Sequence, residues 1–203
     1  MDHLSLSDLV IVIASILVSL SVHEFMHAFV GFKLGDTTAE REGRLSLNPL
    51  NHIDPVMTVI LPIVTIVLFG APILAAKPVP FDPRFVKFDE FGAALIAAAG
   101  PFSNLLLAVA GAFVENWATP GGFLAHALGI FVVLNVALFV FNLLPIPPLD
   151  GSRVLYAFAP EPLQDFMRSI EPLGLFIVFG LVLAGGLGGF LSDLNQAVLN
   201  WLP

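Results

Sequence analysis

Two histidines and a glutamate lie close together near the start of the chain. The segment His23-Glu24-Phe25-Met26-His27 fits the pattern HExxH. On a helix, residues four apart lie on one face and one turn apart, so both imidazoles can reach a single Zn²⁺. Glu24 follows the first imidazole and can accept a proton from water held by such an ion. The motif therefore predicts a zinc site of the kind that activates water.

A catalytic zinc site needs a third protein ligand and one open position. The chain has no cysteine, so the candidates are His3, His52, His126 and the carboxylates. Asp150 stands out because it follows a long apolar segment, in the sequence PIPPLDG at 145–151. The adjacent prolines prevent a helix from continuing, and a break at membrane depth is tolerated only inside protein or beside water. His52 is expected in a loop, His126 near the far end of its helix and His3 at the terminus.

The composition places these residues in a membrane. Only 12% of the residues are charged, whereas soluble domains have about 25%, and the mean hydropathy is +0.93. So few charges cannot cover a water-facing surface, which excludes a soluble globular enzyme. The formal net charge of -8 argues against a nucleic-acid partner. The absence of cysteine excludes disulfides and thiolate chemistry.

Four long apolar segments predict transmembrane helices, at about 9–33, 92–114, 123–144 and 173–191. About 20 helical residues cross a hydrocarbon core of about 30 Å. The first segment lacks the basic leader of a signal peptide, so we interpret it as an uncleaved helix. Residues 163–170 and the tail from 191 have apolar residues at helical spacing, which is typical of helices on a membrane surface.

Residues 55–76 are apolar but contain Pro55, Pro62, Gly70 and Pro72, which permits either a full span or a re-entrant hairpin. If the segment spans, Asp150 and the HExxH end of the first helix lie on opposite membrane faces. If it re-enters, both lie toward one side, and all 8 Lys and Arg fall on that side. The positive-inside rule favours re-entry and makes that side cytoplasmic, with the N-terminus outside. An ordinary fifth span is the alternative.

The segment RLSLN, Arg44 to Asn48, alternates polar and apolar residues before Pro49, which predicts a short strand. The predicted fold is thus an all-α polytopic membrane protein with about four transmembrane helices. It also contains a re-entrant hydrophobic element and a short membrane-associated β-strand or hairpin. We expect one integral membrane domain over residues 1–203.

These segments resemble the site-2 protease family of intramembrane zinc metalloproteases, in its compact prokaryotic branch. The resemblance covers about residues 15–160 and rests on HEFMH, GRLSLNPLNHIDP, AGPFSN and FNLLPIPPLDG. It implies one Zn²⁺ per chain, with His23, His27 and Asp150 as ligands and Glu24 as the catalytic base. It also implies that Asn142 contacts the substrate or the oxyanion. The chain differs from longer members in that we expect no PDZ or CBS module.

The resemblance implies hydrolysis of peptide bonds within or near transmembrane segments of membrane-protein substrates. The expected location is the cytoplasmic membrane of a prokaryote, with the lipid bilayer and a transmembrane substrate as partners. A substrate helix must unwind before attack, and we expect Leu45 to Asn48 to offer it a strand edge. Ser103 and Asn104 are expected to make packing contacts between helices, and Asn135 is expected to serve packing or water entry.

Two other classes of protein place similar residues in a membrane. A metal-ion transporter would repeat acidic or histidine sites along a path, and such a repeat is not evident. A catalytically inactive adaptor that binds membrane helices would have lost Glu24 or a ligand, yet all of them are present. The sequence therefore favours a peptidase.

Overall fold

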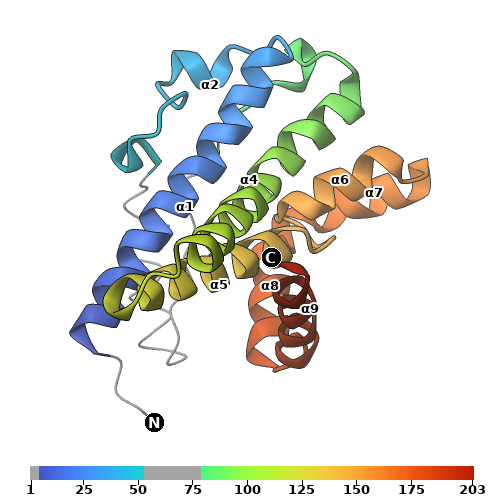
Figure 1. Cartoon of the computed structure of the whole chain (residues 1–203). Helices are drawn as coiled ribbons and strands as arrows, with labels where there is room; N and C mark the ends of the chain where they lie inside the picture. The colour runs from blue at the N-terminus through green and yellow to red at the C-terminus, as the bar shows by residue number, and fades with distance from the viewer. Residues whose placement is uncertain (1–4, 53–78) are drawn as a thin grey trace.

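The computed structural model describes residues 5–52 and 79–203, and helices make up most of them (Figure 1). The α-helices are α1 Leu6–Lys33, α2 Thr38–Arg41, α4 Asp89–Ala118, α5 Gly122–Asn142, α6 Asp150–Phe158, α7 Glu161–Ile170, α8 Gly174–Leu183 and α9 Gly188–Trp201. Short 3-10 helices occur at η1 Pro49–His52, η3 Pro83–Phe85 and η4 Glu171–Leu173. The described residues contain no strand.

Three helices, α1, α4 and α5, are long and apolar enough to cross a membrane, and within the described residues no other helix is. They contain 28, 30 and 21 residues, or lengths of about 42, 45 and 32 Å. α4 packs against α1, α5 and α6. Its Ala108 and Ala112 form a buried core with Val132, Val136 and Val140 of α5. Three of the four predicted transmembrane helices are therefore present.

The predicted fourth transmembrane helix, at about 173–191, is wrong as a single helix. α8 has 10 residues and ends at Leu183, and α9 begins at Gly188. Gly185 between them has a φ of 69°, in the left-handed region that commonly terminates helices. Ten residues extend about 15 Å, which is half of the hydrocarbon core. Hydropathy alone identified the segment, but its glycines divide it.

The two segments with apolar residues at helical spacing are helical, as predicted, and form α7 and α9. The apolar face of α9 contacts protein, because Leu191, Val198, Leu199 and Leu202 pack against the α4–α5 core. In addition, the Asn116 side chain in α4 donates a hydrogen bond to the carbonyl of Pro203. These contacts fix α9 and the C-terminus against α4 and α5.

The predicted strand at 44–48 is wrong, because this segment is irregular and leads into η1. The backbone N–H of Asn48 donates to Ser46 Oγ at 3.1 Å, and His52 Nε2 donates to the carbonyl of Ser46 at 2.7 Å. Serine and asparagine side chains of this kind compete with the ladder hydrogen bonds of a strand. Alternating hydropathy in a turn-rich segment therefore did not produce a strand edge.

Residues 55–76, for which a span and a re-entrant hairpin were both possible, lie outside the described residues. The segments on either side of them meet. The backbone N–H of Lys87 donates to the carbonyl of Leu34 at 2.9 Å, and that of Asp82 donates to Asp36 Oδ2 at 2.7 Å. The C-terminal end of α1 and the N-terminal end of α4 thus lie at the same end of an antiparallel pair.

We predict that Asp36→Ala lowers the free energy of unfolding by about 1–3 kcal/mol. Asp36 is 2% exposed and accepts hydrogen bonds from Thr38 N, Thr38 Oγ1 and Asp82 N. Without the carboxylate, these donors lose their acceptor. Unfolding of the purified protein in detergent measures the change. Asp165→Ala is the control, because Asp165 pairs with Arg168 at the exposed surface, and equal losses in both variants would contradict the prediction.

Candidate metal centre

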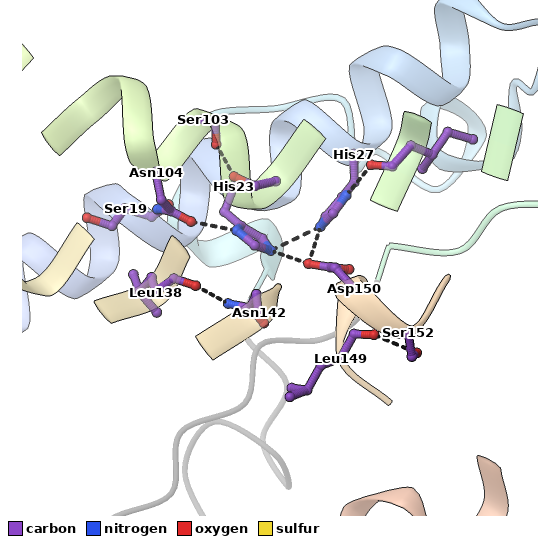
Figure 2. A network of polar contacts seen from close by, with 12 residues as sticks. Ser19, His23, His27, Ser103, Asn104, Leu138, Asn142, Leu149, Asp150 and Ser152 are labelled. Carbon is purple, nitrogen blue, oxygen red and sulfur yellow. Dashed lines mark hydrogen bonds and ion pairs between the residues drawn. The ribbon is translucent and has the colours of Figure 1, made fainter. Parts of the chain in front are cut away.

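His23, His27 and Asp150 converge on one point between α1 and the start of α6 (Figure 2). Asp150 Oδ2 lies 3.2 Å from His23 Nε2 and 3.4 Å from His27 Nε2. The two Nε2 atoms are 3.0 Å apart. Both imidazoles are buried within the protein. The structure thus brings together the HExxH histidines and the aspartate that follows the proline-rich break.

Local geometry explains how Asp150 reaches the histidines. α5 ends at Asn142, before the prolines, and Asp150 is the first residue of α6. A carboxylate is favoured in the first turn of a helix by the helix dipole. A Cβ on Gly151 would lie 2.1 Å from the carbonyl oxygen of Leu143. Glycine follows Asp150 because α6 packs directly on the end of α5, and not because the backbone needs an unusual conformation.

The hydrogen bonds of the two imidazoles direct both Nε2 atoms toward Asp150. His27 Nδ1 is 2.7 Å from the carbonyl oxygen of Ile96, which can only accept, so the Nδ1 atom carries the proton. His23 Nδ1 is 2.7 Å from Asn104 Oδ1 and donates to it. Each Nε2 is therefore left with its lone pair. Such contacts at the second ring nitrogen are typical of metal-ligating histidines.

The donor set fits zinc. Two nitrogen lone pairs and a carboxylate oxygen lie 3.0 to 3.4 Å apart. They repel one another unless a proton or a cation lies between them. Tetrahedral zinc with bonds of about 2.05 Å would separate its ligand atoms by about 3.3 Å.

α4 approaches the centre at a residue without a side chain. A Cβ on Gly100 would lie 2.4 Å from His27 Nε2 and 2.6 Å from His23 Nε2. These are the two nitrogens that face the shared point, so a methyl group would enter the metal position. From the sequence, we predicted no role for Gly100 and packing contacts for Asn104. The sequence did offer a signal for Asn104, because a single polar amide in an apolar helix indicates a specific hydrogen-bond partner.

Glu24 and Asn142 complete the set of predicted site residues. Glu24 lies on α1, is 7% exposed, and has no hydrogen-bond partner within residues 5–52 and 79–203. Its carboxylate is thus available to a ligand. Asn142 is the last residue of α5, and its Nδ2 donates to the carbonyl of Leu138 at 2.9 Å (Figure 2). The role predicted for Asn142 stays a prediction.

The other histidines considered as third ligand lie elsewhere. His52 Nε2 is bonded to the carbonyl of Ser46, and His126 Nε2 is 2.6 Å from Asp8 Oδ1. His3 lies outside the described residues. In the part of the chain that the structure describes, the group that could hold a metal ion is His23, His27 and Asp150.

Comparison with known proteins identifies the family. The profile of Peptidase family M50 matches residues 116–185. "Putative zinc metalloprotease YwhC" of Bacillus subtilis is 37% identical over 187 residues, which cover 88% of this chain and 82% of that protein. "Putative zinc metalloprotease Rip2" of Mycolicibacterium smegmatis is 31% identical over 187 residues, or 91% of this chain and 71% of that protein.

The chain belongs to peptidase family M50. No solved structure matches it significantly. The resemblance to the site-2 proteases is thereby confirmed. Membership in a family of zinc metalloproteases agrees with the donor set at His23, His27 and Asp150. Together with the three apolar helices, it indicates an integral membrane protein.

We predict that Gly100→Ala removes most of the zinc from this M50 protein, because the added methyl group would occupy the space between the two Nε2 atoms. Metal analysis of the purified protein measures the zinc content per chain. Gly129→Ala in α5 is the matched control, since a Cβ there would meet no atom within 4 Å. Undiminished zinc in the Gly100 variant would contradict the geometry of the centre.

Proposed function

We propose that this chain is an intramembrane zinc metalloprotease that hydrolyses peptide bonds within or near transmembrane segments of membrane proteins. The convergence of His23 and His27 with Asp150 carries the proposal. These histidines belong to α1, a helix long and apolar enough to span a membrane. Membership in family M50 supplies the reaction class. The position of the centre along α1 supports a substrate within the bilayer.

His23, His27 and Asp150 would hold the zinc, which when bound lowers the pKa of water and polarises the scissile carbonyl. Glu24 takes a proton from the attacking water and returns it to the leaving amine. Its buried carboxylate, which has no hydrogen-bond partner in the described part of the chain, supports this role. The two carboxylates thus divide the work, since Asp150 lies against both imidazoles and Glu24 makes no hydrogen bond or ion pair to them.

Asn142 is proposed to donate a hydrogen bond to the oxygen that becomes negative during attack. One N–H of its Nδ2 donates to the carbonyl of Leu138, and the second N–H of the same amide is left for the substrate. Loss of one such donor typically costs about 10²–10³ in rate. The position of Asn142 at the last residue of α5, just before the loop to Asp150, supports this role.

The active site is proposed to open toward the cytoplasm, with the N-terminus outside. The chain has 8 Lys and Arg, of which Lys77 lies outside the described residues; the others are Lys33, Arg41, Arg44, Arg84, Lys87, Arg153 and Arg168. The Lys87–Leu34 hydrogen bond joins segments 33–44 and 81–87, which together carry five of these basic residues. The Arg153 guanidinium lies 5.0 Å from the Phe81 ring centroid and thus beside the second of these segments. Residues 5–8 and 115–126 contain no Lys or Arg. The positive-inside rule then makes the basic end cytoplasmic.

We predict that Glu24→Gln retains zinc but lowers cleavage of a model single-span substrate by at least about 10²-fold. The amide cannot accept the proton, whereas the ligands are unchanged. Zinc content and cleavage by the detergent-purified protein are measured together. Asp150→Ala is the companion variant and should lose both zinc and cleavage.

Each alternative class predicts a different result, with ion flux measured in vesicles that contain the same variant. A metal-ion transporter would keep most of its flux in the Glu24→Gln variant, and an inactive adaptor would show no cleavage even as wild type. Cleavage by Glu24→Gln at the wild-type rate would contradict the assignment of the base.

We predict the orientation from single cysteines, which is convenient because the natural chain has none. Arg41→Cys places a thiol at the basic end, and Gly121→Cys places one in the turn between α4 and α5. A membrane-impermeant thiol reagent added to intact cells should label position 121 and should label position 41 only after permeabilisation. The opposite pattern would overturn the orientation and leave the peptidase assignment intact.

A further inference from the structure

Two buried asparagines connect α5 to the zinc ligand His23. Asn104 of α4 and Asn135 of α5 are both 0% exposed. His23 Nδ1 lies 2.7 Å from Asn104 Oδ1, and Asn104 Nδ2 lies 3.0 Å from Asn135 Oδ1. Asn135 Nδ2 lies 2.9 Å from the carbonyl oxygen of Phe131. Figure 2 shows the contact between Asn104 and His23 at the end of this series.

The direction of every bond in the series follows from its last member. The carbonyl of Phe131 can only accept, so the NH₂ group of Asn135 must face it. The Oδ1 atom of Asn135 is then left to accept from Asn104 Nδ2. The other N–H of Asn104 points to the carbonyl of Ser19, at 3.3 Å. Asn104 Oδ1 therefore faces His23, whose Nδ1 must donate.

The opposite orientation of the Asn104 amide would disable the ligand. Its NH₂ group would then face His23 and favour the lone pair on Nδ1. The imidazole proton would move to Nε2, the atom directed at the metal position, where it blocks coordination. The rotated amide would also turn its oxygen toward two acceptors, Asn135 Oδ1 and the carbonyl of Ser19. Asn135 thus disfavours the orientation that would prevent zinc binding.

We propose that Asn135 is a positioning residue of the zinc centre, which acts through Asn104 to keep the lone pair of His23 Nε2 directed at the metal. This inference rests on the proposed function, because it requires His23 to be a zinc ligand. His27 needs no such device, since its Nδ1 donates directly to the backbone carbonyl of Ile96. The difference between the two histidines explains why two amides are buried beside one of them.

The experiment measures the zinc dissociation constant of the full chain in detergent by competition with a chelator. Asn104→Leu should weaken zinc binding by about 10–100-fold, the usual effect of losing such a partner. Asn135→Leu should weaken it by about 10-fold, at the lower end of that range. Asn135→Asp, buried as a neutral carboxylic acid, can donate its O–H to the carbonyl of Phe131 and accept from Asn104 Nδ2, so it should bind zinc nearly as well as the wild type.

Ser21→Ala is the matched control. It removes a buried hydroxyl of α1 that donates to the carbonyl of Leu17 and takes no part in the series. Zinc affinity should therefore be unchanged in this variant.

A double variant tests whether Asn135 acts through Asn104. In the Asn104→Leu background, Asn135→Leu should cause no further loss of zinc affinity. If the two losses multiply, or if Asn135→Leu alone changes nothing, the inference is overturned. If Asn104→Leu does not fold, the comparison of Asn135→Leu with Asn135→Asp decides, because equal losses would indicate a structural role only.

The same measurements separate this inference from the function on which it rests. A wild-type protein that binds no zinc would overturn the proposed function. A wild type that binds zinc and cleaves its substrate, alongside an Asn135→Leu variant of unchanged affinity, would overturn only the role of Asn135.

Discussion

Three electron-pair donors point at one another inside a bundle of apolar helices, and this is the constraint on which the remaining structure depends. Two imidazole nitrogens and a carboxylate oxygen lie within 3.4 Å of one another. Buried acceptors that face each other are unfavourable without a proton or a cation between them. The Nδ1 protons are already engaged by Ile96 and Asn104. A zinc ion bound by the three donor atoms would remove this repulsion, and the surrounding helices hold those atoms in place.

The register between α1 and α4 meets this requirement with two rows of residues spaced by four. Ser19, His23 and His27 face Asn104, Gly100 and Ile96 in antiparallel order. Residues spaced by four lie on one helix face, so one packing register satisfies every contact. A shift of one turn would separate both imidazoles from their acceptors. Because α4 also packs against α5 and α6, the same register determines where Asp150 arrives.

From the sequence alone, the parts of the site that lie within one helix could be predicted. The contacts between helices could for the most part not be predicted. HExxH could be recognised because both histidines belong to one helix, and Asp150 because prolines mark the end of the preceding helix. Gly100 could not be recognised, since its role depends on the distance to another helix. Asn104 and Asn135 were visible as polar residues in apolar segments, but their order of hydrogen bonding depends on helix packing. Spacing along a chain does not encode such distances.

The errors in the predicted fold have a similar origin. The alternation of residues 44–48 satisfied the pattern of a strand, but Ser46 and Asn48 form local hydrogen bonds that the pattern does not consider. The apolar segment at 173–191 satisfied the hydropathy of a span, although Gly185 ends the helix after α8. In both segments a local backbone preference prevailed over the average character of the side chains.

α4 supplies none of the three proposed ligands, yet it determines their geometry. It contributes a carbonyl at Ile96, the absence of a side chain at Gly100 and an amide at Asn104, all on its buried face. Its opposite face exposes Leu95, Phe102, Leu106 and Phe113, as expected where a helix contacts lipid. Substitutions on that face leave the buried row intact, whereas a single methyl group on the other face reaches the metal position. The inner row of α4 is thus as much part of the candidate metal centre as the residues proposed to bind zinc.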